Sequence, residues 1–111
     1  MIVVILRIKT ASVHRAEIVE LIRAIIGPTE AQSSCSLCRF YSETDDDDAL
    51  VLLQEWRSQE DLDRFIRSHD FKRVLAAMDQ GNRAPEFCVN TVSSKAGMEL
   101  VEKLRLSSQA K

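Results

Sequence analysis

The sequence predicts an α+β domain of the ferredoxin-like class, with a four-stranded antiparallel sheet and helices in the order β-α-β-β-α-β. Two apolar runs, Ile2 to Thr10 and Ala49 to Trp56, lack Gly and Pro and are typical of buried strands. Each run is followed by apolar residues at helical spacing. At 111 residues the chain is long enough for one domain of this kind and too short for two.

The first strand and helix occupy the first quarter of the chain. In the strand, Ile2 to Thr10, alternate residues make one face wholly apolar and the other, which carries Arg7, half apolar. Ser12 is the expected N-cap of the helix, and Gly27-Pro28 is expected to supply a left-handed residue and a stop. The buried side of this helix is predicted from the residues that repeat at its period: Ile18, Leu21, Ile22 and Ile25.

A second strand is predicted from Ser34 to Glu43, and its serines indicate an edge position or a partly wet face. Thr44 to Asp48 is then expected to form a solvated hairpin loop, because its four aspartates repel one another and resist burial. The loop lacks the Gly and the distant bidentate Glu of the common calcium loop, so no calcium site is expected there.

The stretch from Ala49 to Met78 changes from strand to helix within about three residues. Ser58 is the expected N-cap of the helix, with Asp61 reaching back to it. A first apolar stripe is formed by Leu62, Phe65 and Ile66, and a second, two residues out of phase, by Phe71, Val74, Leu75 and Met78. This change of phase predicts two short helices that meet at Ser68-His69-Asp70.

The remaining chain is predicted to form a loop at Gly81 to Ala84 and a last strand from Glu86 to Val92. Gly97 to Leu106 can form one more short helix. We therefore expect a domain over residues 1–95 and a C-terminal tail over residues 96–111.

The doubly apolar strands predict a homodimer. Two helices cover only one face of a sheet, and leaving about five apolar side chains of the other face in water would forgo roughly 1.5–3 kcal/mol each. A second subunit that lays its own sheet over this face would remove that loss.

Composition excludes several classes of function. A net charge of −2 and a pI near 5.7 give no electrostatic footprint for nucleic acid or an anionic membrane. An RNA-recognition module has the same element order, but its central strands carry exposed aromatics, and here they are aliphatic. The longest apolar run has five residues, too few for a membrane span or a signal peptide, so a cytoplasmic protein is expected.

The three cysteines are expected to be free thiols. Cys35 and Cys38 are three apart on a predicted strand, where they would point to opposite faces, so neither a shared metal nor a disulfide is expected. No other metal, nucleotide or nucleophile motif is present in the sequence.

With these elements in place, the chain resembles the antibiotic biosynthesis monooxygenase family, the dimeric α/β-barrel group that includes small quinol monooxygenases. The resemblance rests on Leu-Leu-Gln-Glu-Trp56-Arg-Ser58-Gln-Glu-Asp-Leu62, on Ser68-x-x-Phe71, and on the element order of residues 1 to 92. It implies a cofactor-free oxygenase of a small quinol or polyketide-like aromatic. Trp56 matches the tryptophan beside the family's pocket, whereas Phe65 stands where many relatives have a His and Leu52 where polyketide oxygenases have an asparagine.

The candidate site follows from this resemblance and from the break in the helix. We expect an apolar pocket between sheet and helices, walled by Trp56, Phe65 and Phe71. His69, at the break, is the candidate proton acceptor. Arg7 and Tyr41 are candidate contacts to a phenolate or bound oxygen, although an ion pair and a rim position are the alternatives for them.

Cofactor-free oxygenation needs only a dry pocket, a group that favours the substrate anion, and room for O₂. No bound metal, flavin or haem is therefore expected. The alternative, which the sequence does not separate from the enzyme, is a non-catalytic dimer of the same fold that binds a small molecule or is structural.

Overall fold

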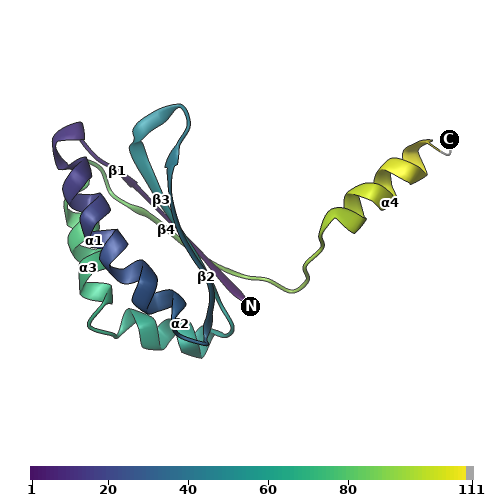
Figure 1. Cartoon of the computed structure of the whole chain (residues 1–111), viewed down its shortest axis with the longest axis horizontal. Coiled ribbons are helices and arrows are strands. Elements are labelled where there is room, and N and C mark those ends of the chain that lie inside the picture. Colours follow the sequence, from purple (N-terminus) through teal and green to yellow (C-terminus); the bar gives the residue numbers. More distant parts are fainter. Residues whose placement is uncertain (110–111) are drawn as a thin grey trace.

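The computed structural model of the protein describes residues 1–109 of the chain (Figure 1). Its elements are, in order, β1 Ile2–Lys9, α1 Ser12–Glu30, β2 Cys35–Glu43, β3 Asp46–Trp56, α2 Gln59–Ile66, α3 Phe71–Asp79, β4 Glu86–Thr91 and α4 Met98–Gln109. The predicted ferredoxin-like α+β class and its element order are confirmed.

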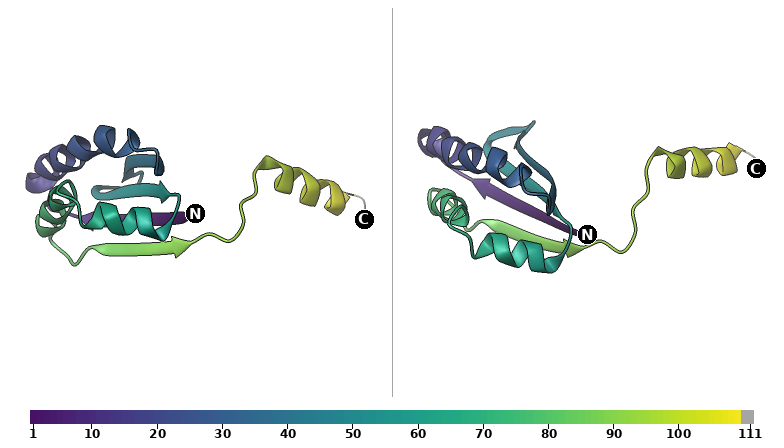
Figure 2. Two further views of the ribbon diagram at one scale, coloured as in Figure 1. Left: turned by 90° about the horizontal axis from the view of Figure 1, so that it is seen from below. Right: turned by 60° about the horizontal axis from the view of Figure 1, so that its bottom comes forward.

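The four strands form one antiparallel sheet in the order β2-β3-β1-β4. The central pair, β1 and β3, is in register from Ile2 opposite Trp56 to Lys9 opposite Ala49. Helices α1, α2 and α3 cover one face, which we call the helix face (Figures 1 and 2). The alternation of β1 therefore buries its even-numbered residues, and the core beneath the helices includes Val4, Leu6, Ile8, Ile18, Ile22, Ile25, Leu50, Leu52, Leu62 and Val74.

The helix after β3 is divided as predicted. Ser58 is the N-cap of α2: its Oγ accepts a hydrogen bond from the Asp61 backbone N–H at 3.2 Å and donates to the Asp61 carboxylate at 2.8 Å. Between α2 and α3, the Ser68 Oγ donates to the Phe65 carbonyl at 2.6 Å, which satisfies a carbonyl at the end of α2. The chain then turns and α3 begins at Phe71.

Two predictions about α1 are wrong. Ser12 is the first helical residue, and the N-cap position is taken by Ala11, which has no side chain to cap the helix. The helix also continues through Gly27-Pro28 to Glu30, because Gly27 does not adopt a positive φ and the Ala31 N–H bonds to the Gly27 carbonyl at 3.0 Å. Pro28 lies in the last turn, and Thr29 after it is fully buried, with a hydroxyl that has no hydrogen-bond partner among the described residues.

The β2–β3 hairpin is tighter than predicted, because β3 begins at Asp46 and only Thr44 and Asp45 form the turn. Asp46 can lie in a strand because its carboxylate pairs with the Lys9 ammonium at 2.8 Å. That hydrogen bond holds the pKa of Asp46 below its ordinary value.

The other face of the sheet, which we call the open face, carries no helix of the domain (Figure 1). It presents half-exposed apolar side chains from β1, β2 and β3, namely Val3, Ile5, Leu37, Val51 and Leu53. No helix within residues 1–109 is long and apolar enough to cross a membrane.

Candidate functional site

Trp56 closes β3 on the helix face and is fully buried. Its indole N–H donates to the Gln54 side-chain oxygen at 3.1 Å, and the Gln54 amide nitrogen in turn donates to the Cys38 sulfur at 3.6 Å. Gln54 is also buried, so these three side chains form a polar chain inside the core. The chain satisfies the tryptophan N–H, which would be costly to bury without a partner.

Trp56 is the first of four aromatic rings that follow one another toward the surface, and we call these four rings the aromatic row. Trp56 stacks on Phe65 of α2 with ring centroids 4.9 Å apart, and Phe65 meets Phe71 of α3 edge to face at 5.5 Å. Phe71 in turn meets Phe87 of β4 edge to face at 6.5 Å. The first three rings are buried, whereas Phe87 is 40% exposed, so the row runs from the core to the sheet edge.

The structure thus brings Trp56, Phe65 and Phe71 together, as the sequence led us to expect. Their rings contact one another and are buried, so the rings themselves fill the space where a pocket was expected. His69 lies in the α2–α3 joint, two residues before Phe71, and is exposed. Phe87 was missed by the sequence analysis; its only signal was an aromatic side chain on the last predicted strand.

Arg7 and Tyr41 lie away from the aromatic row. Both are opposite Val51 on the open face. Arg7 forms ion pairs with Glu43 and, at 3.0 Å, with Glu86, and Tyr41 is half exposed. The hydrogen bond from Arg7 holds the pKa of Glu43 below its ordinary value, and the same contacts raise the pKa of Arg7. Arg7 therefore has the cross-strand ion pairs that were the alternative to ligand contact.

A hollow of about 180 Å³ lies between α1 and β2. Its lining residues are Arg15, Val19, Arg23, Ile26, Phe40, Tyr41, Ser42 and Leu50. Arg15 donates from Nε to the Asp47 carbonyl at 2.8 Å and from Nη2 to the Ser42 hydroxyl at 3.4 Å. These bonds give Arg15 partners at the positive end of α1, where a cation is otherwise unfavourable.

Cys35 and Cys38 do not point to opposite faces, which corrects the sequence analysis. A bulge between Cys35 and Leu37 shifts the register, so both thiols are buried on the helix face. Cys35, Cys38 and Cys88 are free thiols. Burial raises the pKa of Cys35 to about 11 and also raises the pKa of Cys38. In the part of the chain that the structure describes, no group of three or more His, Cys, Asp or Glu side chains is arranged to hold a metal.

A four-stranded ferredoxin-like sheet with an aromatic row beneath its divided helix defines a small α+β domain with one covered and one open face. The sequence profile of the family described as antibiotic biosynthesis monooxygenase matches residues 1–77, so the chain belongs to this family. No match was found among curated protein sequences.

Solved structures show the same fold. Rv0793 from Mycobacterium tuberculosis has a TM-score of 0.78 at 25% identity, with 86% of this chain and 98% of that chain covered. A putative antibiotic biosynthesis monooxygenase from Deinococcus radiodurans gives 0.79 at 11% identity, covering 87% and 97%. A mutant of SnoaB, a cofactor-independent oxygenase from Streptomyces nogalater, gives 0.71 at 15% identity, covering 85% and 94%.

Proposed function

We propose that this chain is a cofactor-independent monooxygenase that binds a small quinol or polyketide-like aromatic between the sheet and the α2–α3 joint. The observation that carries the proposal is the aromatic row, Trp56, Phe65, Phe71 and Phe87. A flat, electron-rich ring stacks well on such side chains. Membership of the monooxygenase family and the fold shared with the cofactor-independent oxygenase SnoaB support the same reaction class.

The substrate itself can supply the electrons for this reaction. A quinol and O₂ give a hydroxyquinone and water: one oxygen atom enters the ring, and the other leaves as water with the two hydrogens lost when the quinol becomes a quinone. The protein must then exclude water, hold the ring, and favour the more reactive phenolate. We assign the first two roles to Trp56, Phe65 and Phe71, and the removal of the phenol proton to His69.

The route to this site is at the sheet edge. Phe71 is edge-on to both Phe65 and Phe87, so rotation of its ring would separate the buried part of the row from the exposed part. Phe71 is also the first residue of α3, directly after the joint between the two helices. His69 lies in the same joint, two residues before Phe71, and is exposed.

We also propose that the functional unit is a homodimer formed by packing two open faces together. The apolar side chains of this face are half exposed, and their burial against a second sheet would stabilise the assembly. Charged side chains, Lys9 and Arg7 with their acidic partners Asp46, Glu43 and Glu86, are gathered at one end of this face, where they would form a polar rim.

One observation favours a second function, a small-molecule binder without turnover. The polar group bonded to Trp56 within the core is the Gln54 amide, which does not accept a proton as a base does. His69, the candidate base, is at the surface. A ligand held deep in the row would therefore meet no general base.

Oxygen uptake and calorimetric binding, measured over a panel of quinols and polycyclic phenols, separate the two functions. The enzyme requires uptake above the blank that falls strongly in Trp56→Phe and in His69→Ala. His14→Ala is the matched control, because His14 is an exposed histidine on α1. Binding without uptake would establish the binder and overturn the enzyme, and equal uptake in all four proteins would move the site away from the aromatic row.

A further inference from the structure

Helix α1 presents a mixed cationic and apolar stripe to strand β2. The stripe consists of Arg15, Val19, Arg23 and Ile26, which follow one another at intervals of three or four residues and therefore share one side of the helix. All four line the hollow of about 180 Å³ between α1 and β2. The two arginines thus stand beside the same concave surface, with apolar side chains between them.

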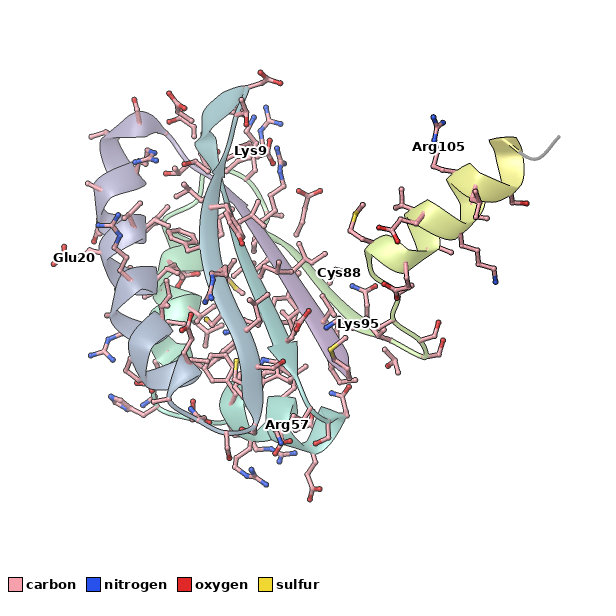
Figure 3. All side chains as sticks on the ribbon, turned by 45° about the vertical axis from the view of Figure 1, so that its right-hand side comes forward. Lys9, Glu20, Arg57, Cys88, Lys95 and Arg105 are labelled. Atoms are coloured by element: carbon pink, nitrogen blue, oxygen red, sulfur yellow. The ribbon has the colours of Figure 1, made fainter. Side chains whose placement is uncertain are left out.

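Neither arginine has an acidic partner among the described residues. Arg15 donates to two neutral oxygens, the Asp47 carbonyl and the Ser42 hydroxyl. Arg23 is exposed and takes part in no ion pair within residues 1–109. Glu20, an acid of the same helix, lines a separate hollow, and Figure 3 shows it on the side of α1 that points away from the sheet. The positive charge at the hollow is therefore available to an anion.

The floor of the hollow is apolar. Phe40 of β2 pairs with Leu52, so its ring lies on the helix face, where it is half-buried. Leu50 of β3 is fully buried, and Val19 and Ile26 of α1 pack against the same core. An aromatic ring of a ligand stacks or packs edge to face on a side chain such as Phe40. The floor therefore favours a ligand with a flat apolar body.

The size and the position of the hollow distinguish it from the aromatic row. Its volume of about 180 Å³ is below the roughly 300–1,000 Å³ of pockets that hold drug-sized molecules, so it suits one ring with a short substituent. It lies at the β2 edge of the sheet, whereas the aromatic row reaches the surface at β4, the opposite edge. A ligand in the hollow and a substrate at the aromatic row would occupy different sites.

We propose that the hollow between α1 and β2 binds a small aromatic carboxylate, with the ring on Phe40 and the carboxylate at Arg23. The planar guanidinium donates two parallel hydrogen bonds to a carboxylate, which makes arginine well suited to this anion. Arg15 lies at the hairpin end of the hollow, beside Asp47, and two of its N–H groups are already bonded there. Arg23 is therefore the principal contact of the carboxylate, and Arg15 adds positive charge at the other end.

Titration of the full-length chain with three probes tests the site. Benzoate carries both the ring and the anion, benzamide is its neutral analogue, and inorganic phosphate is an anion without a ring. Each is titrated by calorimetry into the wild type, Arg23→Gln and Arg105→Gln, and the amide signals that benzoate shifts are located by NMR in the isotope-labelled wild type. Arg105→Gln is the matched control, because it removes an exposed arginine on α4, which stands away from the sheet in Figure 3.

Benzoate is expected to bind the wild type and Arg105→Gln equally, and to bind Arg23→Gln about ten-fold more weakly, because the charge-assisted hydrogen bonds are lost. Benzamide and phosphate should bind the wild type more weakly than benzoate by a similar factor. The shifted amides should be those beside the hollow, at Val19, Phe40 and Ser42.

Three results would overturn the inference. The first is equal affinity of benzoate for the wild type and Arg23→Gln, or no saturable binding at millimolar concentration. The second is an affinity for benzamide or phosphate as high as that for benzoate, because either the charge or the ring would then be unnecessary. The third is a set of shifted amides centred on Phe65 and Phe71, which would place the ligand at the aromatic row and support the site of the proposed function instead.

Discussion

The two faces of the sheet are built from the same strands and have different surfaces. On β3, Leu52 on the helix face is 2% exposed, while its neighbour Leu53 on the open face is half-buried. On β1, Leu6 and Ile5 show the same contrast, at 1% and 39%. The helices cover the helix face over β1, β2 and β3, whereas the open face combines apolar side chains with ion pairs at one end.

This contrast separates what holds the subunit together from what would hold the dimer together. The apolar side chains of the helix face are buried when a single chain folds, so their burial stabilises the subunit. The apolar side chains of the open face would be buried fully only when a second surface covers them, so most of their burial energy would stabilise the dimer. Substitutions of neighbouring residues on one strand should therefore change two different equilibria.

The largest effect is expected from a charge on the open face. Leu53→Asp would place an unpaired carboxylate between two sheets, which costs roughly 3–5 kcal/mol and corresponds to an increase in the dimer dissociation constant of about a hundred-fold or more. Sedimentation velocity across a concentration series measures this. Val13→Asp, on the exposed surface of α1, is the control and should dimerise as the wild type does. An unchanged constant for Leu53→Asp would mean that the open face is not the interface.

The second-largest effect is a difference in stability between alanine substitutions of two adjacent leucines, Leu52 and Leu53. Leu52→Ala should lower the free energy of unfolding by about 2–5 kcal/mol, because it leaves a cavity in a packed core. Leu53→Ala should lower the stability of the isolated subunit by less, since its side chain is partly in water already. Urea unfolding of both variants, measured at protein concentrations low enough that the chain is monomeric, gives the comparison. Equal losses would show that the two faces are equally packed in the monomer.

The cysteines report on both faces through their reactivity. Cys88 is exposed on the open face, while Cys35 and Cys38 are buried on the helix face. With a pKa of about 11, only about one part in a thousand of Cys35 is thiolate at pH 8, and burial also blocks reagents. We use the Leu53→Asp chain because a dimer of open faces would cover Cys88. In this chain we expect Cys88 to react fast with Ellman's reagent, and Cys35 and Cys38 to react only after unfolding. Loss of the fast phase in Cys88→Ser confirms its source, and three fast thiols would contradict the burial of the pair.

The smallest effect is expected from acid. The hydrogen bond from Arg7 places the folded-state pKa of Glu43 below its ordinary value of 4.5. This contribution to stability is therefore present above about pH 4.5 and is lost as the pH falls through the lowered pKa. Glu43→Gln should lose less stability than wild type on acidification, and added salt should reduce the difference because the pair is at the surface. An identical acid dependence in the two proteins would assign no stability to the pair.

Much of the fold could be predicted because local signals agreed with the final packing. The strands β1 and β3 and the joint at Ser68-His69-Asp70 follow from periodicity, and the Ser58 cap follows from residue type. Three predictions failed where contacts in the folded chain outweighed a local signal. The hydrogen bond from the Ala31 N–H to the Gly27 carbonyl carries α1 past Gly27-Pro28. The Lys9 ammonium pairs with Asp46 at the start of β3, and a bulge turns Cys35 and Cys38 to the same face.

The candidate site could be predicted only in part. Trp56, Phe65 and Phe71 meet because they end a strand and flank a helix break, which is local information. Phe87 joins them through the pairing of β4 with β1, and the separation of Arg7 from the row depends on which face of β1 the helices cover. Both depend on contacts between residues far apart in the sequence, which periodicity does not describe.

The strand order has a consequence for the order in which the chain acquires its structure. The β2–β3 hairpin joins strands that are adjacent in the sequence and can form early. Strand β1 lies between β3 and β4 in the sheet, and these partners begin only at Asp46 and at Glu86. During synthesis from the N-terminus, β1 is therefore made first and receives its second neighbour last. Until β4 has emerged, the apolar strand β1 is an unprotected sheet edge, and the nascent chain is most exposed to aggregation at the residues that later lie at the centre of the sheet.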